Sequence, residues 1–78
     1  MTEQELKMRI RKIGLNIAYY RKLRGLSQEQ LSEKAFLSRQ WLGQVEAPGM
    51  TALPSLETLL ILAEALEIDP AALLDFRW

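Results

Sequence analysis

Two helix-start signals lie only eleven residues apart in the segment from Ser27 to Glu46, and this spacing constrains the fold more than any other feature. Ser27 and Gln30 have the spacing of a capping box, in which serine and glutamine side chains bind backbone amides at a helix start. Ser38 is suited to be a second N-cap. The segment is therefore predicted to form two short helices joined by a tight corner. The inward positions at helical spacing are Leu31, Ala35, Leu42 and Val45.

A long helix is predicted before this segment, from Glu3 to Leu23. Thr2 and Glu5 again have capping-box spacing at its start. Gly25 ends it, because glycine adopts the left-handed backbone conformation that follows many helices. Its apolar stripe, in steps of four and three, consists of Leu6, Ile10, Ile13 and Ile17.

Two more helices are predicted after the corner, the first from Ser55 to about Leu66. Its sequence is apolar nearly all round, so it must be buried on more than one side, and the second side can belong to another subunit. The last helix begins with Asp69 as N-cap and Pro70 at the first helical position. No strand pattern is present. The sequence thus predicts an all-α, compact five-helix bundle in a single domain, residues 1–78.

Composition excludes several kinds of site. The chain has no cysteine and no histidine, which rules out disulfides and thiol catalysis and argues against zinc and other metal sites. The longest uncharged run, residues 47–56, is far shorter than the roughly 20 apolar residues of a membrane helix. The N-terminus carries acids where a secretion signal needs bases, so we expect a cytoplasmic protein.

Charge is unevenly distributed although the chain is neutral overall. Residues 7–39 contain nine cations and two carboxylates, for a net charge of +7, and residues 46–78 have a net charge of −5. A polyanion would therefore meet the first half of the chain only. Solvated helix faces are the alternative explanation, because such clustering is also common on ordinary surfaces.

Short sequence motifs distributed over four-fifths of the chain resemble those of a known family. In order, they are Ile13-Gly14, Ile17, Arg21, Arg24-Gly25-Leu26-Ser27-Gln28, Leu31, Leu37-Ser38-Arg39, Glu46 and Pro54-Ser55-Leu56-Glu57-Thr58-Leu59. At this spacing the stretch resembles the phage repressor and Cro family, also called Xre-type helix-turn-helix regulators. The resemblance implies a lambda-repressor-like fold in which the second and third helices form the DNA reader.

The resemblance also implies a set of DNA-binding residues. Gln28 would hold a phosphate and brace the third helix, while Arg39, Gln40 and Gln44 would read bases from one exposed face. Ordinary surface residues are the competing interpretation. Trp41 either contacts sugar or a thymine methyl, or packs on the following loop against Met50 or Leu53. The full predicted set is Gln28, Ser38, Arg39, Gln40, Trp41 and Gln44.

Two further expectations concern the geometry of the reader. Arg21 and Glu46 match a family pair that joins the first helix to the end of the third, and we expect an ion pair between them. Phe36 stands at the corner, where the family usually has glycine and the backbone is often left-handed. Either the corner bends differently here, or packing of Phe36 offsets the strain.

The predicted function is sequence-specific binding of double-stranded DNA by a transcriptional regulator, most simply a repressor that occupies an operator. The alternative is a protein-interaction module, such as an antitoxin-like regulator, for which DNA contact is secondary. An enzyme is not expected, since Glu29 and Glu33 have no pocket, metal or phosphate loop beside them. No cofactor or small-molecule ligand is expected.

Family logic also implies a homodimer whose recognition helices enter successive major grooves. The competing view is that Phe76 and Trp78 fold back onto their own core. The predicted dimer interface is Leu62, Leu73, Leu74, Phe76 and Trp78.

Overall fold

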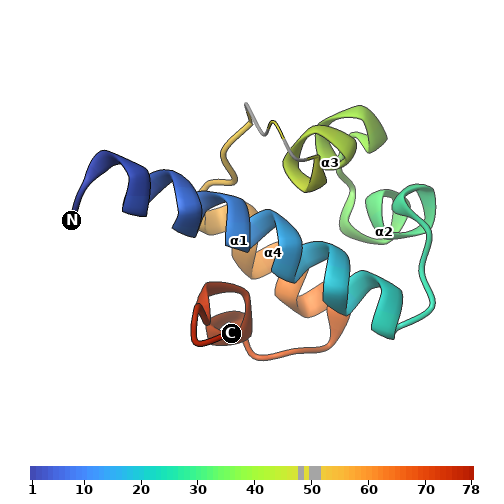
Figure 1. Ribbon diagram of the computed structural model, residues 1–78. Helices are drawn as coiled ribbons and strands as arrows, with labels where there is room; N and C mark the ends of the chain where they lie inside the picture. Colours follow the sequence, from blue (N-terminus) through green and yellow to red (C-terminus); the bar gives the residue numbers. More distant parts are fainter. Residues whose placement is uncertain (48, 50–51) are drawn as a thin grey trace.

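The computed structural model describes residues 1–47, 49 and 52–78, and every regular element in this part of the chain is helical. Figure 1 shows α1 as the longest element, crossing α4, with α2 and α3 together on one side of the molecule. None of the helices is long and apolar enough to cross a membrane, within the residues described. The elements are α1 (Glu3–Leu23), α2 (Gln28–Ala35), α3 (Arg39–Glu46), α4 (Leu56–Leu66) and the 3-10 helix η1 (Pro70–Leu74).

Local capping sets the start of each α-helix. The hydroxyl of Ser27 accepts a hydrogen bond from the backbone amide of Gln30, whose side chain accepts one from the amide of Ser27, which completes the predicted capping box. The hydroxyls of Thr2, Ser38 and Ser55 accept from the amide three residues on. Each cap satisfies an amide that the helix itself leaves free.

Gly25 ends α1 as predicted, with φ at +70°. The amide of Leu26 donates to the carbonyl of Arg21, and the amide of Gly25 donates to that of Lys22. These two bonds form a Schellman motif, which satisfies the last carbonyls of the helix. The chain therefore turns at once and begins α2 only three residues after Gly25.

The core is one cluster contributed by all five elements, and it corrects part of the predicted dimer interface. Leu62 and Leu73 are 0% exposed within a single chain, so they offer no surface to a second copy. The reason is that α4 packs against α2, η1 and α1, which cover the side that carries Leu62, whereas Leu56, Leu60 and Ile61 of the same helix remain exposed. The fully buried large side chains are Ile17, Leu31, Leu42, Val45, Leu62, Leu66 and Leu73.

The expected fifth α-helix is a 3-10 helix of five residues, so four α-helices replace the five predicted. In a continued α-helix the amide of Arg77 would bind the carbonyl of Leu73. That amide binds the side chain of Asp75 instead, and the Leu73 carbonyl accepts from the buried side-chain amide of Asn16. The hydrogen bonds of Arg77 to Asp75 also lower the pKa of the Asp75 carboxyl to about 2.

Residues 75–78, here called the tail, run back along α1. The indole nitrogen of Trp78 donates to Asn16 Oδ1 over 2.9 Å, and Lys12 Nζ lies 5.1 Å from the centroid of the Trp78 ring. Phe76 is half-buried, whereas Trp78 remains 61% exposed. The tail thus follows the fold-back alternative and still leaves an aromatic surface in solvent.

Phe36 adopts the left-handed conformation at the corner, with φ 56° and ψ 43°. The corner therefore does not bend differently from one built on glycine. Packing does not offset the strain either, because Phe36 is 94% exposed. A left-handed conformation costs a residue with a Cβ atom about 1–2 kcal/mol, and this chain retains that cost.

Replacing Phe36 with glycine is expected to raise the free energy of unfolding by about 1 kcal/mol, because glycine adopts positive φ without the steric penalty. Urea denaturation measures the change. Phe36→Ala is the control, since alanine keeps the Cβ atom and the strain. An equal effect of the two substitutions, or a loss of stability in Phe36→Gly, would contradict this explanation.

Candidate nucleic-acid interface

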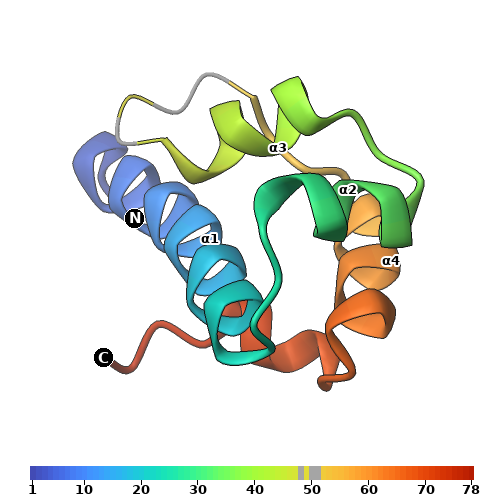
Figure 2. The same ribbon diagram turned by 90° about the vertical axis from the view of Figure 1, so that its right-hand side faces the viewer.

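Helix α3 lies at one edge of the molecule, with α1, α2 and α4 on one side of it (Figure 2). Leu42 and Val45 are buried in the core and fix its inner face. Arg39, Gln40 and Gln44 are all exposed. The outer face therefore presents one guanidinium and two amides to solvent, as the sequence analysis expected.

The start of α3 is held by Ser38 and Trp41. The Ser38 hydroxyl accepts a hydrogen bond from the Trp41 amide over 3.2 Å. The Trp41 side chain is half-buried and packs against the core cluster. Of its two expected neighbours, Leu53 is largely exposed and Met50 lies outside the described residues. The burial of Trp41 favours packing over base contact.

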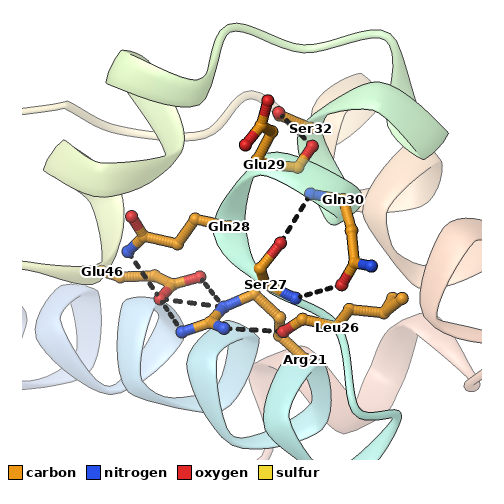
Figure 3. Close-up of polar contacts among 8 residues, drawn as sticks. All are labelled: Arg21, Leu26, Ser27, Gln28, Glu29, Gln30, Ser32 and Glu46. Carbon is orange, nitrogen blue, oxygen red and sulfur yellow. Dashed lines mark hydrogen bonds and ion pairs between the residues drawn. The ribbon is translucent and has the colours of Figure 1, made fainter.

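The end of α3 is tied to α1 by an ion pair between Arg21 and Glu46 (Figure 3). Arg21 Nε lies 2.9 Å from Glu46 Oε2, and Arg21 Nη2 lies 2.9 Å from Glu46 Oε1. The two side chains are only 11% and 5% exposed. Two parallel bonds fix both distance and direction, so the pair orients α3 relative to α1.

Gln28 and Leu26 complete what we call the Arg21 cluster, which consists of Arg21, Leu26, Gln28 and Glu46. Gln28 Nε2 donates to Glu46 Oε1 over 3.1 Å, and Arg21 Nη1 donates to the carbonyl of Leu26 over 2.8 Å. Figure 3 shows Gln28 reaching from α2 toward Glu46. The cluster therefore joins α1, the turn after it, α2 and α3, and Gln28 braces α3 directly.

Arg24 has a role that the sequence analysis did not find. Its Nε donates to the carbonyl of Leu66 over 2.7 Å, and its Nη2 donates to that of Glu67 over 3.0 Å. In the sequence Arg24 stands at the carboxyl end of α1, where a cation is favourable. In the structure it binds the carboxyl end of α4 instead. Its partners are 42 and 43 residues away, so no local pattern could identify them.

Positive charge is sparse around α3. Arg39 is the only cation of α3 itself, and residues 47–56 contain no charged side chain. Among the described residues, no cluster of His, Cys, Asp or Glu could hold a metal ion. The exposed face of α3 is therefore suited to hydrogen bonding with base edges, and phosphate contacts need cations from other elements.

A profile of the helix-turn-helix family matches residues 17–73. The chain belongs to this family. The control protein C.SmaI of Serratia marcescens is 42% identical over 59 residues, 76% of this chain and 68% of that protein. The immunity repressor protein of Bacillus phage phi105 is 44% identical over 61 residues, which cover 78% of this chain and 41% of the repressor. These matches confirm the resemblance to Xre-type regulators.

Two solved structures share the fold. One is the restriction-modification controller protein C.AhdI from Aeromonas hydrophila, with a TM-score of 0.73 and 39% identity over 82% of this chain and 94% of that one. The other is SinR, a master regulator for biofilm formation, in complex with DNA, with a TM-score of 0.74 and 35% identity. That similarity covers 81% of this chain and 98% of the SinR chain.

Removing one partner of the Arg21–Glu46 pair is expected to lower the free energy of unfolding by about 3–5 kcal/mol, because the other charge stays buried and unpaired. Urea denaturation of Arg21→Met and Glu46→Leu measures this loss, and the double variant should be more stable than either single one. Arg77→Ala, which breaks the exposed pair with Asp75, is the control and should change stability little. Single variants as stable as this control would contradict the assignment.

Proposed function

We propose that this protein is a transcriptional regulator that binds specific double-stranded DNA sequences by inserting α3 into the major groove. The observation that carries the proposal is the division of α3 into two faces. Leu42 and Val45 are buried, whereas Arg39, Gln40 and Gln44 are exposed. An α-helix fits the major groove of B-DNA, and these side-chain types bind base edges there.

The relatives support the same function. The curated ones are a control protein and an immunity repressor, and a structural neighbour at 35% identity is a regulator in complex with DNA. Regulators of this kind act by occupying DNA and need no catalytic group. We therefore propose operator occupancy as the mode of action.

Each exposed group has a specific role in this proposal. Arg39 would bind guanine O6 and N7 through two hydrogen bonds, and Gln40 and Gln44 would bind adenine N6 and N7. Gln28 would donate to a phosphate, because its Nε2 carries two N–H groups and only one is needed for Glu46. The Ser38 hydroxyl would add a second contact to the backbone next to the start of α3.

Replacing Gln40 and Gln44 together with alanine is expected to relax sequence preference, because each lost two-bond contact removes about 1–3 kcal/mol of discrimination. Selection from a random duplex pool measures the preference, and circular dichroism confirms that the helices remain. Gln4→Ala, which removes the same kind of side chain from the first turn of α1, is the control. An unaltered selected sequence in the double variant would refute base reading by α3.

We propose further that the protein acts as a homodimer paired through its tail. With Leu62 and Leu73 buried, the proposed interface is reduced to Leu74, Phe76 and Trp78. Leu74 and Trp78 are 46% and 61% exposed, and Leu74, Phe76 and the exposed Met8 of α1 line one groove. Two-fold pairing would let two recognition helices enter major grooves about 34 Å apart.

Leu74→Lys is expected to convert the dimer into a monomer, since a charge in an apolar interface is costly. Leu60→Lys is the matched control, because Leu60 is 49% exposed on α4 and lies outside the proposed interface. Sedimentation equilibrium measures the mass of both variants. An unchanged mass for Leu74→Lys, or a monomer only for Leu60→Lys, would place the interface elsewhere.

A second function, binding of a partner protein with DNA contact secondary, is favoured by one observation. Phe36 is strained and almost fully exposed, and it lines a surface groove with Leu37, Ile61 and Ala65. Contiguous apolar surfaces of this kind often mark binding sites. The salt dependence of DNA affinity separates the two functions. A DNA reader loses affinity steeply with salt and discriminates strongly between sequences, whereas a partner-binding module does neither.

A further inference from the structure

Residues 3–12 of α1, here called the α1 arm, precede the segment that matches the family profile, which begins at residue 17. Figure 1 shows these turns extending beyond the other helices. The arm carries two carboxylates and four cations, which are Lys7, Arg9, Arg11 and Lys12. Its charge is thus positive in a chain whose total is zero.

One face of α1 connects two of these cations with the recognition helix. Lys7, Arg11, Gly14, Ala18 and Arg21 follow one another in steps of four and three, so they lie along one stripe of the helix. At one end of this stripe Arg21 binds Glu46 of α3. Gly14 in the middle is buried. The stripe therefore follows the side of α1 that faces α3 and continues toward the N-terminus through Arg11, which is half-buried, and Lys7, which is exposed.

The other two cations of the arm, Arg9 and Lys12, lie on the side of α1 next to the tail. Lys12 donates to the carbonyl of Trp78 over 3.0 Å. Arg9 lines the groove between α1 and the tail, together with Phe76. Arg9 and Arg11 are two residues apart and so about 200° apart around the helix. The arm thus carries one arginine, Arg11, on the side of α3 and another, Arg9, on the side of the tail.

Lys7 is not committed to a strong contact within the chain. It pairs with Glu3 over 3.4 Å, and both side chains are more than 70% exposed. Exposed pairs of this kind contribute only about 0–1 kcal/mol, so Lys7 can exchange Glu3 for a phosphate at little cost. The segment after α3 offers no charged side chain for that contact.

We propose that the α1 arm binds the sugar-phosphate backbone of DNA through Lys7 and Arg11, outside the bases that α3 reads. The inference rests on the proposed DNA-binding function and adds a second, sequence-independent contact to it. Lys7 lies 14 residues from Arg21, about 21 Å along the helix at 1.5 Å per residue. The arm therefore extends the contact along the duplex by up to about six base pairs at 3.4 Å per pair.

The test compares Arg11→Gln with Arg9→Gln, which remove the same charge from different sides of the arm. The affinity of the dimeric protein for its selected duplex is measured over a range of salt concentrations. Sedimentation equilibrium first establishes that every variant is still a dimer, because Arg9 lies in the groove proposed for pairing. Each lost phosphate contact lowers the slope of log affinity against log salt by about 0.9. Because a dimer loses one contact in each protomer, we expect a decrease of about 1.8 for Arg11→Gln and for Lys7→Gln, and about twice that for the double variant. Arg9→Gln should keep the wild-type slope.

Arg11→Lys keeps the charge and should retain the wild-type slope, which separates phosphate binding from a structural effect. The sequence selected from a random pool should be the same in all these variants, because phosphate contacts carry no direct sequence information. If Arg11→Gln and Arg9→Gln have equal slopes of log affinity against log salt while the selected operator is unchanged, the inference about the α1 arm is wrong. The proposed function would then still stand. A wild-type protein that selects no sequence would overturn the proposed function as well.

Discussion

The Arg21 cluster is the interaction on which the geometry of the reader depends. Helix α3 has only eight residues, and a helix of two turns is not stable in water without tertiary contacts. Burial of Leu42 and Val45 holds it on the core, but apolar contacts alone do not fix its direction. The paired bonds of Arg21 to Glu46, with Gln28 as a third member, add that direction.

The cost of burying two charges explains why this cluster is so fully bonded. Desolvation of an ion pair offsets much of its Coulomb energy, so the net contribution to stability is small even where the geometry is good. What the pair adds is orientation, because Arg21 and Glu46 reach optimal distances in only one arrangement of α1 and α3. The exposed row of Arg39, Gln40 and Gln44 inherits that arrangement, since it belongs to the same short helix.

Local chemistry made much of the fold predictable. Each serine or threonine cap and the glycine turn at Gly25 follow from bonds that span three to five residues. Long-range contacts explain what could not be predicted. The fifth helix is shortened by Asn16, which lies 57 residues from the carbonyl it binds. Leu62 and Leu73 are buried because three elements meet around α4, and sequence periodicity alone could not assign that burial to one chain or two.

The candidate site was more predictable than the surfaces around it. Its base-reading residues lie on one helix, where a turn of about 3.6 residues places Gln40 and Gln44 on the same side. Phe36 illustrates the opposite case. The sequence indicated strain at that corner, but not that its side chain would remain in solvent. The exposure of Phe36, Leu74 and Trp78 follows only from the folded structure and not from the sequence pattern.

Chemical protection of bound DNA tests the central claim most directly. Dimethyl sulfate methylates guanine at N7 in the major groove and adenine at N3 in the minor groove, so it reports which groove the protein occupies. With a duplex selected by the protein, the account predicts protection of guanine N7 in two half-sites one helical turn apart. Protection of adenine N3 only would show that α3 does not read the major groove. The same conclusion would follow if the protein binds the duplex at a defined stoichiometry and protects no guanine N7.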